Sequence, residues 1–210
     1  MRVQVKICGL STAETVDAAV AGDAAWLGFV FFPPSPRNIA PEQAAALIAR
    51  APAKLGKVAV LVDADDALIA RIVAAGVTAL QFHGEETPER LASLRRHGLE
   101  LWKAVPVRTS DDLIAARAYR GAADRILYDA KTPKGTLPGG MGLRFDWKLL
   151  EGFDHPLPWA LSGGLDADNI AEATATTGAR LVDISSGVER APGVKDMDKI
   201  AAFLQAAARL

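Results

Sequence analysis

The sequence predicts an α/β fold of one domain, a single (β/α)8 TIM barrel over residues 1–210. Apolar runs typical of buried strands alternate along the chain with Ala-, Leu- and Ile-rich segments that have helical spacing. Repeated β-α units require parallel strands joined by helical crossovers, and eight units in about 200 residues is the size of a compact closed barrel with outer helices. An open, doubly wound sheet is the structural alternative.

Each of the eight units is recognised from its own residues. The predicted strands are VQVKICG (3–9), AAWLGFVF (24–31), GKVAVLV (56–62), TALQFHG (78–84), LELWKAV (99–105), DRILYDA (124–130), LPWALSGG (157–164) and ARLVDISSG (179–187). The segments with helical spacing are 11–22, 40–51, 63–76, 87–98, 109–121, 166–178 and 196–210. In the sixth unit a Gly-, Pro- and Thr-rich loop, 131–144, precedes a short helical stretch near 146–152. We expect this loop either to form a mobile lid or to make a long surface turn.

Polar residues mark the starts of the predicted helices, and glycines mark their ends. An N-cap side chain accepts from the free N–H groups of the first turn, and glycine adopts the left-handed conformation that ends a helix. The predicted N-caps are Ser11, Asp65, Thr87, Ser110 and Asp166. The predicted terminal glycines are Gly22, Gly76, Gly98, Gly121 and Gly178.

The composition is that of an ordinary globular protein and excludes several function classes. The chain is 50% hydrophobic and 23% charged with a net charge of −1, so nothing attracts the whole molecule to nucleic acid or to an anionic membrane. A single cysteine excludes an intrachain disulfide, and with three scattered histidines it predicts no metal site. No signal peptide and no apolar run of about 20 residues is present, which predicts a cytoplasmic protein.

Candidate functional residues gather where the predicted strands end, which is where (β/α)8 barrels carry their chemistry. The only cysteine, Cys8, closes the alternating run of the first strand, and the second strand leads into a loop with Arg37. The last two units, LSGGLDADNI and VDISSGVE, place glycines and serines after a strand. Such loops offer backbone N–H groups and hydroxyls to an anion, so they predict a small-molecule substrate with a phosphate monoester.

Seven ordered motifs together resemble the phosphoribosylanthranilate isomerases of tryptophan biosynthesis. They are KICGL, FVFFPPSPR, QFHG, YDAKTP, GGMGLRFDW, LSGGL and DISSGVE, and they cover nearly the whole chain. The sequence departs slightly at Phe82, where the family often has Leu, and at Tyr128, where many relatives have another apolar residue. We expect Phe82 to point away from the barrel interior. The resemblance implies a cofactor-free Amadori rearrangement of N-(5-phosphoribosyl)anthranilate to 1-(2-carboxyphenylamino)-1-deoxyribulose 5-phosphate.

The resemblance also implies roles for individual residues. Cys8 corresponds to the general base, Asp129 to the general acid, and Arg37 to an arginine that faces the anthranilate carboxylate. Asp183 is expected to orient the substrate amine or ribose, and His83 to contact substrate. The expected phosphate site consists of Gly163, Gly164, Ser185, Ser186 and Gly187.

The chemistry sets conditions on the two catalytic groups. Opening the furanose requires a proton on the ring oxygen, so Asp129 would need a raised pKa. A thiolate can then remove the C2′ proton, and Cys8 needs a cationic or donor-rich setting to be ionised near neutrality. Lys6 lies on the same face of the strand as Cys8 and is expected to supply part of that setting.

Two other readings keep the barrel but change the function. A different phosphate-binding barrel enzyme, such as a sugar-phosphate isomerase, epimerase or aldolase, would need other residues. A Schiff-base aldolase would require a strand-end lysine in a dry pocket, and Lys103 is the candidate. The barrel could also be a catalytically silent phosphosugar-binding module. The sequence is compatible with a monomer or a homodimer.

Overall fold

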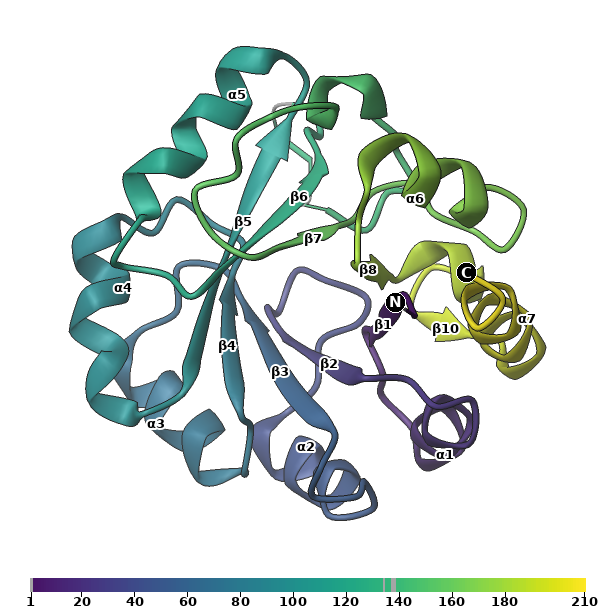
Figure 1. Cartoon of the computed structure of the whole chain (residues 1–210). Helices are drawn as coiled ribbons and strands as arrows, with labels where there is room; N and C mark the ends of the chain where they lie inside the picture. Colours follow the sequence, from purple (N-terminus) through teal and green to yellow (C-terminus); the bar gives the residue numbers. More distant parts are fainter. Residues whose placement is uncertain (1, 134, 137–138) are drawn as a thin grey trace.

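The computed structural model describes residues 2–133, 135–136 and 139–210, and its centre is a closed barrel of eight parallel strands. Figure 1 shows the strands gathered in the middle of the molecule, with helices around them. The barrel strands are β1 (Gln4–Cys8), β2 (Trp26–Phe31), β3 (Gly56–Leu61), β4 (Ala79–Phe82), β5 (Glu100–Val107), β6 (Arg125–Ala130), β7 (Trp159–Leu161) and β8 (Leu181–Ile184). β1 pairs with both β2 and β8, which closes the sheet and excludes the open alternative. The predicted fold class is confirmed.

Helices connect successive strands on the outside of the barrel. The α-helices are α1 (Ala13–Ala21), α2 (Pro41–Ile48), α3 (Asp66–Ala74), α4 (Pro88–Leu94), α5 (Ser110–Ala115), α6 (Ile170–Thr177) and α7 (Met197–Ala207). The 3₁₀-helices are η1 (Arg95–His97), η2 (Ala116–Tyr119), η3 (Trp147–Leu150) and η4 (Ser186–Val188). In the sixth connection, irregular in sequence, η3 is the only helix among the described residues. A short antiparallel hairpin of β9 (Glu189–Ala191) and β10 (Val194–Lys195), which the sequence did not predict, precedes α7.

The helix ends follow the predicted chemistry, with shifts of one to three residues. Asp65 and Thr87 cap α3 and α4 as predicted. Thr12 and Thr109 stand at the N-caps of α1 and α5, in place of the neighbouring Ser11 and Ser110, so local chemistry alone did not select between equally suitable side chains. At α6, Asn169 stands at the boundary without a side-chain cap bond, and the predicted Asp166 accepts from the backbone N–H groups of Asp168 and Asn169 at 3.0 and 2.9 Å. Gly22 also differs from expectation, because its φ of −83° is not left-handed.

Alternation along the strands separates the inside of the barrel from the outside. One buried cluster, which includes Val58, Trp102 and Leu127, fills the interior toward the strand starts. Cys8 packs in a second interior cluster with Val30 and Val60. Phe82 and Tyr128 belong instead to the large apolar layer between strands and helices, which confirms the predicted direction of Phe82. The interior near the strand ends therefore combines this small apolar cluster with polar side chains such as Asp129 and Asp183.

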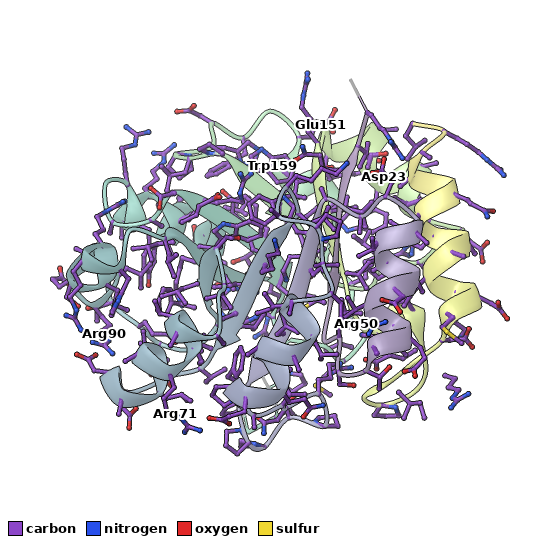
Figure 2. All side chains as sticks on the ribbon, turned by 90° about the horizontal axis from the view of Figure 1, so that it is seen from below. Asp23, Arg50, Arg71, Arg90, Glu151 and Trp159 are labelled. Atoms are coloured by element: carbon purple, nitrogen blue, oxygen red, sulfur yellow. The ribbon has the colours of Figure 1, made fainter. Side chains whose placement is uncertain are left out.

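Charged side chains outside the barrel mainly join neighbouring helices at the surface. Arg71 pairs with Glu42 at 2.7 Å, and Figure 2 shows Arg71 and Arg90 at the periphery of the molecule. Exposed ion pairs of this kind contribute little to the free energy of unfolding. Among the described residues, no helix is long and apolar enough to cross a membrane.

Candidate active site

One cavity at the C-terminal end of the barrel collects the predicted site residues. Cys8, the last residue of β1, lines it together with Asp129 of β6. Arg37, His83 and Asp183 line the same cavity. The structure therefore brings together the sulfur, the carboxyl group and the three predicted substrate contacts, which are far apart in sequence.

Cys8 is buried, and the residue paired with it on the adjacent strand β2 is a glycine, whose missing side chain leaves space for the sulfur atom. Gly28 pairs with Cys8, and a Cβ atom on Gly28 would lie only 3.0 Å from the Cys8 Sγ atom. Burial raises the pKa of the Cys8 thiol above its ordinary value, although the charges of Lys6 and Lys195 act to lower it. Lys6 thus acts in the predicted direction, but the loss of hydration is the larger effect.

Lys6 is completely buried in the barrel interior and is paired across β1 and β8. Its Nζ atom donates to Oδ1 of Asp183 at 2.8 Å, and Ser162 Oγ lies 3.3 Å from Oδ2. Burial acts to lower the pKa of Lys6, but the Asp183 carboxylate and the nearby Cys8 outweigh it, so the pKa is raised. This pair places a fixed cation directly beneath the cavity.

Asp129 is held by its own strand and by a histidine from β4. Its Oδ1 atom accepts from the backbone N–H of Ala130 at 2.9 Å, and its Oδ2 atom lies 3.2 Å from Nε2 of His83. The other ring nitrogen of His83, Nδ1, lies 3.4 Å from Nε2 of Gln81. Gln81 was not singled out from the sequence, although it begins the QFHG motif. Its Oε1 atom is buried and has no hydrogen-bond partner among the described residues, on a side chain that lines the cavity.

Arg37 is buried and is held by a residue that the sequence analysis did not assign. Its Nε and Nη2 atoms donate to the two carboxylate oxygens of Glu189 at 2.7 and 2.8 Å. Its Nη2 atom also donates to the carbonyl oxygen of Gly140 at 3.0 Å. Glu189 is the last residue of the VDISSGVE segment. Its place in that motif is the feature of the sequence that could have marked it as a site residue.

The two glycine- and serine-containing loops line a second, adjoining cavity. Gly163, Gly164, Ser185 and Ser186 face it, and it shares Asp129, Ser162 and Asp183 with the first. Both glycines have positive φ, and a Cβ atom on Gly163 would lie 2.8 Å from the Ala130 nitrogen. Only glycine allows the backbone this approach.

Gly187, the fifth residue predicted for the phosphate site, is not among the described residues that line this cavity. A Cβ atom there would lie 2.0 Å from the carbonyl oxygen of Leu165. The absence of a side chain therefore lets η4 pack against the loop that carries Gly163 and Gly164.

The predicted lid approaches the site through two glycines. Positions 134, 137 and 138 of the loop lie outside the described residues. A Cβ atom on Gly139 would lie 2.7 Å from Asp129 Oδ2, and one on Gly140 would lie 2.5 Å from Arg37 Nη1. This part of the loop therefore covers the acid and the arginine. Lys131 pairs with Asp112 at 2.6 Å near the surface.

Lys103, the candidate for a Schiff base, does not line the cavity. Its neighbours Trp102 and Ala104 fill the barrel interior, so Lys103 points outward. The Nζ atom donates to the carbonyl oxygens of Phe82 and Gly84 at 3.3 and 2.6 Å and to Glu86 at 3.1 Å. A buried ammonium with three acceptors is a structural cation, and this disfavours the aldolase reading.

Comparisons with known proteins agree with this site. A sequence model of the family described as N-(5'-phosphoribosyl)anthranilate (PRA) isomerase matches residues 5–206. The chain belongs to this family. The N-(5'-phosphoribosyl)anthranilate isomerase of Zymomonas mobilis subsp. pomaceae is 60% identical over 208 residues, with 98% of each chain covered. That of Parvibaculum lavamentivorans is 52% identical over 214 residues, with 100% of each chain covered.

Solved structures of the isomerase have the same fold over the whole chain. The Thermotoga maritima enzyme superposes with a TM-score of 0.90 at 35% identity, covering 99% of this chain and 100% of the other. A structure of phosphoribosyl anthranilate isomerase in complex with reduced 1-(o-carboxyphenylamino)-1-deoxyribulose 5-phosphate has a TM-score of 0.87 at 33% identity, with the same coverage. The activity of this chain is the isomerisation of N-(5'-phosphoribosyl)anthranilate in tryptophan biosynthesis.

Proposed function

We propose that this isomerase uses Cys8 as the general base and Asp129 as the general acid of an Amadori rearrangement. The observation that carries the proposal is that these two side chains, from β1 and β6, line one cavity. Arg37 and Asp183 line the same cavity, and the loops with paired glycines and serines adjoin it. The substrate has a carboxylate at one end, a phosphate at the other and the reacting ribose between them, which matches this order of groups.

Asp129 acts first, by protonating the furanose ring oxygen. The lone pair of the anthranilate nitrogen forms a C1′=N bond as the C1′–O bond breaks, which leaves a cationic Schiff base. The hydrogen bond from Ala130 N–H and the contact with His83 hold the Asp129 carboxyl group in place. A positioned acid of this kind contributes about 10²–10⁴ in rate.

Cys8 then removes the C2′ proton, which the neighbouring cation has made acidic. The electron pair of the C2′–H bond forms a C1′=C2′ bond and neutralises the nitrogen. The resulting enolamine tautomerises to the ketone as C1′ gains a proton and the C2′ hydroxyl loses one. Atoms and electrons balance without an oxidant or reductant, so the chemistry calls for no cofactor. Burial raises the pKa of Cys8, so the thiol ionises to the active thiolate at a higher pH than an ordinary cysteine does.

The remaining cavity residues bind and orient the substrate. Arg37 donates to the anthranilate carboxylate, a group that suits the planar guanidinium. Asp183 accepts from the substrate amine or a ribose hydroxyl, and the hydrogen bond from Lys6 fixes its position. The backbone N–H groups near Gly163, Gly164, Ser185 and Ser186 bind the phosphate.

Two substitutions test the catalytic roles. Cys8→Ala and Asp129→Asn should each reduce turnover by about 10²–10⁴. Both variants should still bind the reduced product analogue, because the carboxylate and phosphate contacts remain. Turnover is followed by the decrease in anthranilate fluorescence, and binding by titration. Near-wild-type turnover in either folded variant would exclude that residue from its role.

The oligomeric state and the location of this chain stay predictions. Among its solved relatives is a structure of monomers generated from the dimeric Thermotoga maritima enzyme, 35% identical with a TM-score of 0.86. For this chain we infer a monomer or a homodimer, which light scattering would distinguish. The buried, unpaired Cys8 suits a reducing compartment, and this supports a cytoplasmic location.

A further inference from the structure

Arg37 is fixed along one edge by a single buried carboxylate. Both oxygens of Glu189 accept from it, one from Nε and one from Nη2, in a side-on bidentate pair. The two side chains are 8% and 4% exposed, so solvent does not compete for this contact. Bidentate pairs between arginine and a carboxylate fix the orientation of the guanidinium as well as its position.

Glu189 is itself held by the hairpin that precedes α7. Its Oε1 atom also accepts from Lys195 Nζ at 2.7 Å, and its Oε2 atom accepts from the backbone N–H of Gly193 at 3.2 Å. Lys199 donates to the Glu189 carbonyl oxygen at 2.8 Å. Burial acts to raise the pKa of Glu189, but Arg37 and Lys195 outweigh it and hold the pKa below its ordinary value. The carboxylate is therefore ionised and immobile.

This arrangement leaves one part of the guanidinium for a ligand. Of its five N–H donors, the one on Nε and those on Nη2 are directed to Glu189 and Gly140. Within the described part of the chain, Nη1 makes no hydrogen bond to protein, and Arg37 lines the substrate cavity. The contact from Glu189 thus determines which edge of Arg37 a substrate meets.

The substrate has two anionic ends, a carboxylate and a phosphate, so the fixed orientation of Arg37 can help to distinguish them. An unrestrained arginine is flexible, and it pairs as readily with a phosphate as with a carboxylate. A guanidinium that is already paired with one carboxylate attracts a dianion less, and it loses little conformational freedom on binding. We propose that Glu189 is a positioning residue that orients Arg37 for the ring carboxylate and so gives the isomerase its preference for carboxylate-bearing substrates. This rests on the contact between Arg37 and the anthranilate carboxylate proposed above.

The test compares two ligands that differ only in the carboxylate. One is reduced 1-(o-carboxyphenylamino)-1-deoxyribulose 5-phosphate, and the other is the same compound without the ring carboxyl group. Glu189→Gln keeps the shape of the side chain but removes its charge. We expect this variant to bind the first ligand about tenfold more weakly and the second with nearly unchanged affinity. With the natural substrate, KM should rise by a similar factor while kcat changes little.

A purely structural role for Glu189 makes a different prediction. In that case Glu189→Gln would weaken both ligands equally, and this result would overturn the proposal, as would unchanged binding of both. Lys199→Met is the matched control, because it removes a contact to the Glu189 backbone and leaves the carboxylate intact. It should bind both ligands as the wild type does. If Glu189→Gln does not fold, Glu189→Asp keeps the charge but shortens its reach, and it should show the same selective loss.

Arg37→Lys separates this proposal from the one on which it rests. If Arg37 contacts the ring carboxylate, Arg37→Lys also lowers the preference for the carboxylate-bearing ligand, and adding Glu189→Gln lowers it no further. If Arg37→Lys lowers the preference and Glu189→Gln does not, only the positioning role fails. If Arg37→Lys leaves the preference unchanged, the carboxylate contact itself is wrong.

Discussion

The imidazole of His83 lies between Gln81 and Asp129, with its Nε2 atom 3.2 Å from the Oδ2 atom of Asp129. The Gln81 amide nitrogen lies 3.4 Å from Nδ1 on the other side of the same ring. His83 and Gln81 together therefore orient the carboxyl group that we propose as the acid.

Replacement of His83 by Asn should reduce kcat by about 10–10², less than the loss of the acid itself, because the carboxyl group remains but loses its orientation. Binding of the reduced product analogue should change less than kcat does. Steady-state kinetics measure both effects. His97→Asn, in η1 and outside the cavity, is the control and should leave kcat unchanged. Equal losses in the two variants would show that His83 has no special relationship to Asp129.

The pH dependence of the reaction should report the buried thiol. Cys8 acts only when deprotonated and Asp129 only when protonated, so the profile of kcat/KM against pH should be bell-shaped. Because burial raises the pKa of Cys8, the limb that reports the thiol should lie above the ordinary thiol range. Lys6, Lys195 and Asp183 are the charged neighbours of the sulfur, and the two lysines only moderate this shift.

Cys8→Asp tests the assignment, because a carboxyl group ordinarily ionises at about pH 3.9. Residual activity of this variant should lack the alkaline limb that reports the thiol. The profile is measured from about pH 5 to about pH 10 with unfolding checked at each value. A wild-type profile that is flat over this range would contradict the role of a high-pKa thiol.

Gly139→Ala should reduce kcat/KM by about tenfold or more, because its methyl group would lie against the Asp129 carboxyl group and His83. Gly135→Ala is a matched control in the same loop. The two glycines have φ values of +72° and +81°, but only Gly139 has heavy atoms within 4 Å of the added Cβ. Backbone strain is thus common to both variants, at about 1–2 kcal/mol each, and only the contact differs. Similar activities would show that this part of the loop does not cover the acid.

Lys103→Met should lower the free energy of unfolding by about 3–5 kcal/mol, because it leaves the Glu86 carboxylate buried without its cation. Lys131→Met removes a lysine from the more exposed pair with Asp112, so its cost should be below about 1 kcal/mol. Urea denaturation measures both. Borohydride treatment in the presence of substrate should trap no adduct on Lys103, and a trapped adduct would restore the aldolase reading.

Local patterns in the sequence determined the architecture and indicated the catalytic pair that we propose. Strand alternation placed Lys6 and Cys8 on one face, and the repeat of eight β-α units required a closed parallel sheet. These are properties of short segments, because side-chain direction in a strand depends only on residue parity. The family motifs then assigned Cys8 and Asp129, which the structure brings into one cavity.

The tertiary structure alone decided which groups meet and how strongly they are desolvated. Glu189 reaches Arg37 across 152 positions of sequence. Lys103, expected at a strand end, lies in the middle of β5 and points away from the barrel interior. The raised pKa of Cys8 also follows from burial that no residue pattern reveals. The physical reason is that closure of the barrel sets the distances between strand ends and the access of water, and both depend on all eight strands together.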